Sequence, residues 1–418
     1  MIYDISIIGA GVSGTFAALR LAEQHKNLKG IVFEFGPPPP TCIRQDPLNI
    51  KRRRRQLEGW LGCFPTGDGK LYLEDDYQKV LSKVDGRKAG PIQKWFSSVL
   101  QEFNQDAFHV SKSPSAAVVK RAKNIGFKTV THSYQQWCPD QIHKLSKELA
   151  NRIESHGNVT LSFDTEVFSI SKVGDIFKVV TSNGEYNCKS ILMCVGRSGW
   201  RWVNTVYKDF GILKENNFAT FGMRLELPSS VLKDMNQSHC SFVGDTDVSI
   251  GPLQWQGSII QEDHADVTIA AFRSNENRWK TDKVFFSLKN KVNFESEGWQ
   301  QVDRIAKLSY LLSGDRVGRE RIKLFLKMQD QLSFLPEYNW IPYVLENYVE
   351  KIIPGTISKG FFHVPDIDTA ENLSIDVNNS LETQVEGFFV AGESFGIKGI
   401  AAAGLTGAIA LEGAAKYV

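Results

Sequence analysis

The chain has 418 residues with 49 Lys and Arg against 47 Asp and Glu, so its formal net charge is only +2. Nucleic-acid-binding domains usually have a pI above about 9, and the pI near 8.1 therefore argues against nucleic acid as a partner. The hydrophobic content of 42% excludes a disordered chain and, at this length, predicts two or three domains.

No apolar run approaches the roughly 18 residues that a membrane span needs, and the start MIYDISIIGAGVSG lacks a positively charged leader region. The cysteines are scattered without metal-like spacing, as expected for reduced thiols. They are Cys42, Cys63, Cys138, Cys188, Cys194 and Cys240. We expect a cytoplasmic protein with no membrane partner and no bound metal.

The first 35 residues predict a strand, a glycine-rich turn, a helix and a second strand. An apolar strand over residues 5–8 and a helix over residues 15–22 flank GxGxxG at residues 9–14. In this motif one glycine permits the turn, one lets the backbone approach a diphosphate, and one lets helix and strand pack closely. The second strand, residues 30–34, ends at Glu34, whose carboxylate can accept from ribose hydroxyls. We predict a dinucleotide site lined by Gly9, Ala10, Gly11, Val12, Ser13, Gly14, Phe33, Glu34 and Phe35.

Five consecutive cations, Lys51 to Arg55, lead into the segment from Gly59 to Lys70. Without them the chain has 44 basic residues against 47 acidic ones, so its basic character is local. This run either begins a solvated helix or holds an anion.

The central part of the chain alternates between helix and strand. Helical spacing covers residues 88–103, 114–122 and 139–156. Strands follow at 159–163, 166–170, 176–180 and 190–195, and the last of these runs into Gly196-Arg197-Ser198-Gly199.

The region from 201 to 366 predicts a second domain. Strands are expected at 218–227 and 267–272, and helices at 297–312 and 340–353. Its aromatic residues are candidates for the wall of an apolar pocket: Trp255, Trp279, Trp299, Phe325, Tyr338, Trp340, Tyr343 and Tyr348.

Near the C-terminus, an apolar strand over residues 387–391 ends in Gly392-Glu393, and a helix rich in small residues follows at 400–415. This arrangement resembles the FAD enzymes of the glutathione-reductase-like superfamily, in which such an element returns to the first domain. The resemblance implies an α/β fold, with a Rossmann-like FAD-binding domain of the glutathione-reductase type and an inserted α+β substrate domain.

The domain boundaries follow from this resemblance. The FAD-binding domain is expected to be discontinuous, at residues 1–75, 125–200 and 367–418. A helical connection at 76–124 covers the flavin loop, and the substrate domain occupies 201–366.

Four segments resemble a family of FAD-dependent dehydrogenases of largely unassigned substrate, in the family's order. They are Gly67 to Leu71 (GDGKL), Val195 to Trp200, Phe221 to Pro228, and Val390 to Glu393 with Gly399. The chain departs from the family at residues 59–65, where Gly-Gly is usual, and lacks a Cys-Pro-Gly-Gly-like segment between residues 264 and 290. These departures concern the flavin loop and the substrate domain, so the resemblance implies no particular substrate.

By this resemblance, FAD is the cofactor, and the helix that begins near Ile400 directs its N-terminus at the flavin. Gly69 and Lys70 lie in the flavin loop, Val167 meets the adenine, and two cations of the basic run approach the diphosphate. The further cofactor residues implied are Arg53, Arg54, Gly196, Arg197, Gly392, Glu393, Lys398, Gly399, Ile400 and Ala401.

The motifs that are missing narrow the chemistry. Cys42 and Cys63 are about twenty residues apart, which disfavours a redox-active dithiol, and a second GxGxxG for a nicotinamide nucleotide is absent. We expect a flavin that exchanges hydride at N5 with a small organic substrate, helped by transient NAD(P)H or a protein electron donor. A flavin-dependent hydroxylase is the alternative, and an FAD-dependent RNA-modifying protein is a second.

Three residues are candidates for acid-base catalysis. Lys70 belongs to the expected flavin loop, where a salt bridge or a contact to the flavin edge is the competing interpretation. Arg224 and Glu226 alternate along a strand and so share one face, where an ion pair is the competing interpretation. The histidines His132, His264 and His363 are isolated in the sequence.

Overall fold

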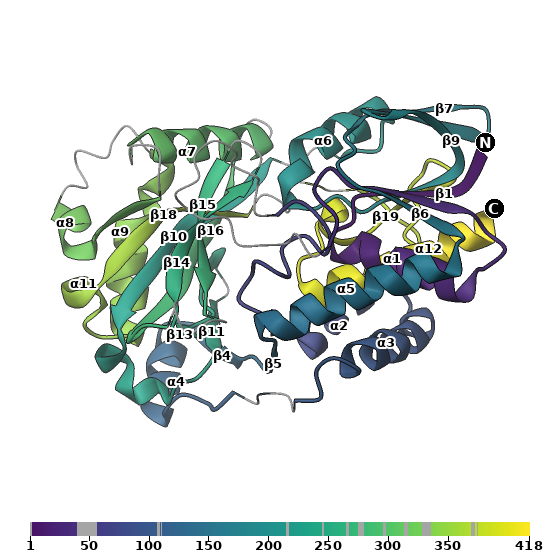
Figure 1. The fold of residues 1–418 in the computed structure, drawn as a ribbon. Coiled ribbons are helices and arrows are strands. Elements are labelled where there is room, and N and C mark those ends of the chain that lie inside the picture. Colours follow the sequence, from purple (N-terminus) through teal and green to yellow (C-terminus); the bar gives the residue numbers. More distant parts are fainter. Residues whose placement is uncertain are drawn as a thin grey trace. The chain divides into compact units, whose positions relative to one another are not determined.

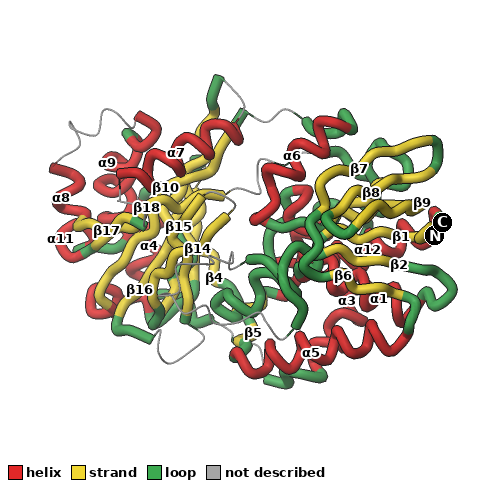
Figure 2. Tube along the Cα trace, turned by 45° about the horizontal axis from the view of Figure 1, so that its top comes forward, coloured by secondary structure: helices red, strands yellow, loops and turns green. Residues whose placement is uncertain are grey.

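The computed structural model describes residues 2–39, 57–106, 109, 111–214, 217–244, 246–264, 267–274, 280–295, 298–312, 317–327, 336–368, 373 and 375–418. The chain forms two compact units. Unit 1 comprises Met1–Ala107, Gln135–Glu215 and Leu373–Val418, and unit 2 comprises Phe108–Tyr134 and Asn216–Asn372. Helices and strands are both abundant (Figure 2), and the predicted α/β class is confirmed.

A seven-stranded sheet forms the centre of unit 1, in the order β6-β2-β1-β9-β8-β7, with β19 also paired to β9. The strands β6, β2, β1, β9 and β19 are parallel, whereas β8 and β7 form an antiparallel extension. Their bounds are β1 (Ile2–Ile8), β2 (Gly30–Phe33), β6 (Val159–Ser162), β7 (Val167–Val173), β8 (Ile176–Thr181), β9 (Gly184–Met193) and β19 (Phe388–Val390). A two-stranded sheet pairs β3 (Lys70–Leu71) with β5 (Gln135–Gln136).

Helices pack on this sheet (Figure 1) and on one another. They are α1 (Val12–Gln24), α2 (Leu73–Leu81), α3 (Gly86–Gln101), α5 (Pro139–His156), α6 (Trp200–Asp209) and α12 (Ile400–Tyr417), with 3-10 turns at Arg197–Gly199 and Gly392–Phe395. The helices α1 and α12 approach closely, because a Cβ on Gly407 would lie 2.0 Å from the carbonyl oxygen of Ser13. The helices predicted at 15–22, 139–156 and 400–415 are thus confirmed.

An eight-stranded antiparallel sheet forms the centre of unit 2, in the order β17-β18-β10-β16-β12-β11-β4, with β13 paired to β16. A separate hairpin joins β14 to β15. The bounds are β4 (Phe127–Thr131), β10 (Phe218–Pro228), β11 (Cys240–Gly244), β12 (Val248–Ile250), β13 (Gln254–Trp255), β14 (Ser258–His264), β15 (Val267–Arg273), β16 (Lys283–Asn293), β17 (Gly318–Arg321) and β18 (Phe361–Asp368).

The helices of unit 2 are shorter on the whole. They are α4 (Ala116–Asn124), α7 (Gly298–Leu312), α8 (Ile322–Lys327), α9 (Trp340–Val344), α10 (Glu350–Ile352) and α11 (Thr356–Lys359), with 3-10 helices at Ser229–Met235 and Pro336–Tyr338. The single helix predicted at 340–353 is interrupted by a π-helical turn at Leu345–Val349.

The unit boundaries differ from those expected from the sequence. The helices α2 and α3 pack against α12 and belong to unit 1, whereas α4 belongs to unit 2, so residues 76–124 are not one connection. Residues 125–134 lie in unit 2 because β4 pairs with β11. Residues 201–215 lie in unit 1, where the hydroxyl of Tyr207 on α6 donates to the carbonyl of Ser394 at 2.7 Å.

The central strand of unit 2 separates an apolar face from a charged one. Met223, Leu225 and Leu227 of β10 are fully buried in the hydrophobic core of the unit. The alternating residues Arg224 and Glu226 therefore face the other side of the sheet. The expectation that these two side chains share a face is confirmed.

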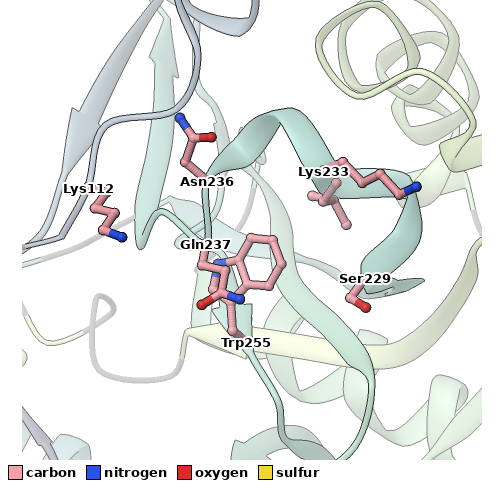
Figure 3. A pocket seen from close by; sticks show the side chains of 7 residues that line it. Lys112, Ser229, Lys233, Asn236, Gln237 and Trp255 are labelled. Carbon is pink, nitrogen blue, oxygen red and sulfur yellow. The ribbon is translucent and has the colours of Figure 1, made fainter.

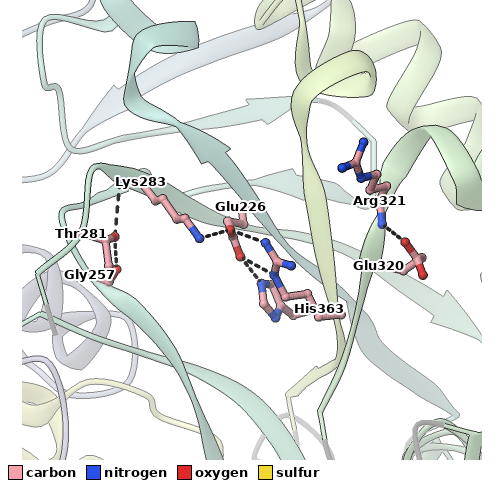
Figure 4. Close-up of polar contacts among 8 residues, drawn as sticks. Glu226, Gly257, Thr281, Lys283, Glu320, Arg321 and His363 are labelled. Carbon is pink, nitrogen blue, oxygen red and sulfur yellow. Dashed lines mark hydrogen bonds and ion pairs between the residues drawn. The ribbon is translucent and has the colours of Figure 1, made fainter.

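Glu226 is surrounded by basic side chains on that face (Figure 4). Its carboxylate lies 2.7 Å from Nε2 of His363, accepts two hydrogen bonds from Arg319 at 3.0 and 2.8 Å, and pairs with Lys283 at 2.5 Å. Burial works to raise the pKa of Glu226, but the hydrogen bonds from His363, Arg319 and Lys283 outweigh burial and hold this pKa well below its ordinary value.

A second ion-pair group lies on β10, β16 and β18 of the same sheet. Asp366 of β18 is fully buried, accepts from Ser287 at 2.6 Å and pairs with Lys289 at 2.9 Å and Arg224 at 3.5 Å. Arg224 and Glu226, the two candidates for acid-base catalysis in this region, therefore both form ion pairs within the sheet. This is the structural interpretation that stood against catalysis for these residues.

Replacing Glu226 by Gln should destabilise unit 2. The substitution removes the negative charge that compensates Arg319 and Lys283 and weakens their hydrogen bonds, so we expect a loss of about 1–3 kcal/mol in the free energy of unfolding at pH 7. The pKa of Glu226 is lower in the folded state than in the unfolded state. The difference in unfolding free energy between wild type and Glu226→Gln should therefore be largest above the unfolded pKa of about 4.3 and should decrease as the pH falls below this value. Urea unfolding of both proteins at pH 7 and pH 4, followed by circular dichroism, measures this difference.

The matched control is Glu320→Gln on the neighbouring strand β17. Glu320 is exposed and accepts from the backbone N–H of Arg321, so its replacement should change stability by no more than about 0.5 kcal/mol. Equal stability of Glu226→Gln and wild type at pH 7 would contradict the stabilising role of this ion-pair group.

The N-terminus of α12 is capped by a buried acid from another helix. Asp76 of α2 is fully buried, and its Oδ2 accepts from the backbone N–H groups of Ala401 at 3.1 Å and Ala402 at 3.3 Å. Its other oxygen accepts from Nζ of Lys79 at 2.8 Å. Burial raises the pKa of Asp76 and outweighs the opposing effect of Lys79 and the two N–H groups.

Asp76→Ala should therefore destabilise unit 1 by about 1–3 kcal/mol, because two buried N–H groups lose their acceptor. Asp76→Asn keeps an acceptor oxygen and removes a desolvated charge, so its stability should stay within about 1 kcal/mol of wild type. The control Glu74→Ala removes an exposed acid from the same helix. Urea unfolding distinguishes the variants, and an equal loss for Ala and Asn would show that the charge rather than the acceptor matters.

Candidate cofactor site in unit 1

The three glycines of the first turn are required for three different physical reasons. Gly9 has a φ of +94°, and Gly14 approaches it so closely that an added Cβ would lie 1.9 Å from its carbonyl oxygen. Gly11 has an extended backbone with φ −60°, which any residue adopts. Among the described residues, no atom lies within 4 Å of a Cβ built on Gly11. Neither conformation nor packing against the described chain explains this glycine, whereas close approach of a ligand does.

The helix α1 begins directly after this open position. Gly11 is its N-cap and offers no side chain, and the first turn contains no acidic residue. The first N–H groups of an α-helix have no acceptor within the helix and carry positive partial charge. The turn and the helix N-terminus together suit a diphosphate.

Glu34 is buried against the turn and makes different contacts from those predicted. Its carboxylate accepts from three backbone N–H groups, those of Ala10 at 2.7 Å, Gly36 at 2.8 Å and Gly59 at 2.9 Å. A carboxylate has about four acceptor positions, so at most about one remains for a ribose hydroxyl. The structure thus gives Glu34 a role in holding the turn, and the predicted ribose contact stays a prediction. Its neighbours differ in exposure, with Phe33 buried and Phe35 49% exposed.

The segment after residue 56 lies against the glycine turn. The N–H of Leu61 donates to the carbonyl of Ala10 at 2.9 Å, and Gly11 pairs with Leu61 in a parallel bridge. Trp60 is fully buried, and its indole N–H donates to the carbonyl of Ser146 on α5. The segment expected to run along the flavin is therefore fixed to the turn. Residues 51–55, with the predicted cofactor contacts Arg53 and Arg54, lie outside the described residues.

Lys70 ends this segment in a buried position. Its Nζ pairs with Asp68 at 3.3 Å, and only 5% of its side chain is exposed. Burial lowers the pKa of Lys70 and outweighs the opposing charge of Asp68. Gly69 before it has a φ of +69°, and a Cβ there would lie 2.2 Å from the carbonyl oxygen of Trp137. The salt bridge that competed with catalysis as an interpretation of Lys70 is present, while its flavin contact and its role in catalysis stay predictions.

Two further turns meet at the carboxyl ends of β9 and β19. Arg197 donates through Nε to Glu393 at 2.7 Å, and the exposed Gly196 lies beside the same carboxylate. Gly392 has a φ of +66°, and a Cβ there would lie 3.3 Å from the hydroxyl oxygen of Ser13 on α1. Residues far apart in the sequence are brought together because β1, β9 and β19 are parallel and end at the same sheet edge.

The N-terminus of α12 has a partner within the protein that the sequence did not predict, and its flavin contact stays a prediction. The sequence predicts that it points at the flavin, with Lys398, Gly399, Ile400 and Ala401 in contact, but the N–H groups of Ala401 and Ala402 already donate to Asp76. A Cβ on Gly399 would lie 2.2 Å from a carboxylate oxygen of Asp76, so this glycine is explained by the protein itself. The carbonyl of Lys398 accepts from Lys79 at 3.2 Å. Sequence reasoning missed Asp76, because an acid in the first turn of a helix is an ordinary feature.

Val167 lies at the start of β7, opposite Thr181 of β8. The preceding residues reach the segment after β2, since the N–H groups of Thr165 and Asp164 donate to the carbonyls of Glu34 and Gly36 at 2.8 and 3.0 Å. The position predicted to meet the adenine is therefore two residues away from a direct contact with Glu34. Arg224 and Glu226 lie in unit 2.

Within the described ranges, no group of His, Cys, Asp and Glu side chains could hold a metal ion. In the same part of the chain, no helix is long and apolar enough to cross a membrane.

Neither protein-family models nor curated proteins match this sequence. Similar solved structures include a flavoprotein/dehydrogenase from Cytophaga hutchinsonii, with 12% identity, TM-score 0.43, and coverage of 99% of this chain and 78% of that one. Glycine oxidase from Bacillus cereus shares 13% identity at TM-score 0.41, with coverage of 99% and 94%. Aklavinone-11 hydroxylase, in complex with FAD and aklavinone, shares 12% identity at TM-score 0.38, with coverage of 99% and 60%. Because these scores and identities are low, the fold assignment rests on the strand order and turn geometry of the chain itself.

Proposed function

We propose that unit 1 binds FAD and that the protein is an FAD-dependent oxidoreductase acting on a small organic substrate. The single observation that carries this proposal is Gly11. It is a glycine at the N-terminus of α1 whose Cβ position is open among the described residues and whose backbone needs no glycine. Gly9 and Gly14 are each explained by the turn, so this position is left for a ligand that approaches the backbone closely.

The residues of the site would divide the work as follows. The turn at residues 9–14 and the N-terminus of α1 hold the diphosphate, and Glu34 keeps the turn in shape through Ala10, Gly36 and Gly59. The pair of Arg197 and Glu393 orients the turns after β9 and β19 beside this region. Val167, Gly392 and the segment that ends at Gly69 and Lys70 are proposed to line the remainder of the cofactor.

The bound flavin supplies hydride exchange at N5, in the direction of dehydrogenation or reduction. The protein's part is to orient the substrate, exclude water and hold a proton where it is needed. Lys70 is a candidate for holding a proton, because burial lowers the pKa of its ammonium group. Asp76 already accepts from the N–H groups of Ala401 and Ala402 at the start of α12, so these two groups are not open to negative charge in a ligand.

The electrons are proposed to come from or go to transient NAD(P)H or a protein donor. No second GxGxxG is present in the sequence, and the described cysteines Cys138, Cys188, Cys194 and Cys240 are free thiols. Burial raises the pKa of Cys188 and of Cys194 to about 12, so neither thiol is a ready nucleophile.

Gly11→Val should weaken FAD binding at least about tenfold while leaving the fold intact. The Cβ of the added side chain enters space that is open among the described residues, and the side chain prevents close approach of a diphosphate. FAD content after purification and a titration of apoprotein by flavin fluorescence measure the affinity, and thermal unfolding checks the fold.

The control is Gly14→Ala, whose Cβ meets the carbonyl of Gly9, so that it should lower the unfolding temperature itself. Wild-type FAD affinity in Gly11→Val, or wild-type protein that never binds FAD, would overturn the proposal.

The type of flavin chemistry is tested by the reduced protein. After anaerobic reduction and admission of air, a dehydrogenase or reductase should return to the oxidised spectrum without a long-lived intermediate. Bleaching of the flavin absorbance by NADH or NADPH under anaerobic conditions would identify the nicotinamide donor. A long-lived intermediate during reoxidation would instead favour the hydroxylase alternative.

A further inference from the structure

Unit 2 contains a pocket of about 580 Å³ that the proposed flavin chemistry does not use (Figure 3). It is lined by Lys112, Ser229, Leu232, Lys233, Asn236, Gln237 and Trp255. All of these residues belong to unit 2. The volume falls within the roughly 300–1,000 Å³ of small-molecule sites, and a lining with so many polar groups selects a polar ligand.

The charge of the lining is positive. Lys112 and Lys233 both contribute, no Asp or Glu lines the pocket, and neither lysine has an ion-pair partner among the residues that the structure describes. The acid next in sequence, Asp234, is paired with Arg121 at 2.6 Å. Two ammonium groups without a compensating carboxylate attract an anion such as a phosphate.

One aromatic residue, Trp255, lines the same pocket. In Figure 3 its ring lies between Lys112 on one side and Lys233 and Ser229 on the other. Its indole N–H donates to the carbonyl of Ser238 at 2.7 Å, which fixes the ring, and part of the ring packs on the core of unit 2. The remainder is exposed to the pocket. A fixed, partly exposed indole is a stacking surface for a planar ring.

Two amide side chains complete the lining. Asn236 and Gln237 follow each other with φ of +51° and +53°, a conformation that a residue such as glutamine rarely adopts. The amide of Asn236 donates to the carbonyl of Ser113 at 3.2 Å, leaving its oxygen as an acceptor. Amides can donate to and accept from the edge of a heterocycle.

The walls of the pocket are joined by hydrogen bonds from two separate segments. The N–H of Ser115 donates to the carbonyl of Asp234 at 2.9 Å. The N–H of His239 donates to the hydroxyl of Ser111, so the segment that contains Lys112 is held at both ends to the segment that contains Asn236 and Gln237. The pocket is therefore built without a ligand, which lowers the ordering cost of binding.

We propose that this pocket binds a nucleoside phosphate, with the base stacked on Trp255 and the phosphate held by one of the two lysines on either side of the ring, Lys112 or Lys233. The inference rests on unit 2 alone and does not depend on FAD binding to unit 1. A pocket of this size with two cations and one aromatic ring favours a single nucleotide over a nucleic-acid strand, which would need cations and rings in series.

The test is a calorimetric titration with ADP of the full-length protein that has been loaded with FAD and then freed of excess FAD, so that the proposed site in unit 1 is filled and no free FAD competes for the pocket. The double variant Lys112→Gln/Lys233→Gln should weaken ADP binding at least about tenfold, because it removes the charge-assisted contact to the phosphate on whichever side of the ring the phosphate binds. The control Lys120→Gln/Lys123→Gln removes the same charge from exposed positions on α4 and should leave the affinity unchanged.

Fragments of the probe separate its two parts. Trp255→Leu should weaken ADP and adenosine several-fold but leave inorganic pyrophosphate unaffected, whereas the lysine variant should weaken pyrophosphate and spare adenosine. Gly11→Val should retain ADP binding in this pocket even if it loses FAD, so failure of either proposal is seen separately. No binding of ADP at millimolar concentration, or equal binding by both lysine variants, would overturn the inference. Tight binding of a single-stranded oligonucleotide with a steep salt dependence, without ADP binding, would also overturn it.

Discussion

The buried carboxylate of Glu34 holds together the parts of unit 1 on which the candidate cofactor site depends. It accepts from the N–H groups of Ala10 in the glycine turn, Gly36 after β2 and Gly59 in the segment that leads to Lys70. Three hydrogen bonds to one ionised group are stronger than neutral ones and are costly to leave unmade in a buried place. The shape of the turn, and with it the open position at Gly11, therefore follows from a single side chain at the end of a strand.

Two helix N-termini in unit 1 have similar dipoles and different partners. The first turn of α1 contains no acid and begins beside the open position at Gly11. The first turn of α12 is closed by Asp76, an acid of the protein itself. A helix N-terminus favours negative charge in either case, so what separates a ligand site from a packing contact is whether the chain already supplies the anion.

The cations of unit 2 likewise differ in whether the chain itself supplies their counterion. On the charged face of its large sheet, Arg319 and Lys283 are neutralised by Glu226, and Lys289 by Asp366. In the pocket, Lys112 and Lys233 have no such partners among the described residues. A buried charge is costly unless it is paired, so Arg224 and Glu226 form ion pairs that stabilise the fold. The lysines around the indole ring are not buried, so they need no such partner and can bind a ligand.

The sequence by itself determined the α/β class, the βαβ start with its three glycines, and most helices and strands, because these depend on local periodicity and turn chemistry. It also identified Gly11 and Glu34 as members of one site, since both belong to a short motif. Only the tertiary structure decided what the predicted side chains touch: Glu34 is bound by Gly59, Ala401 by Asp76, and Glu226 by Arg319. Such partners lie tens to hundreds of residues apart, and they are chosen by strand order and by the need to pair buried charge, which no local pattern encodes.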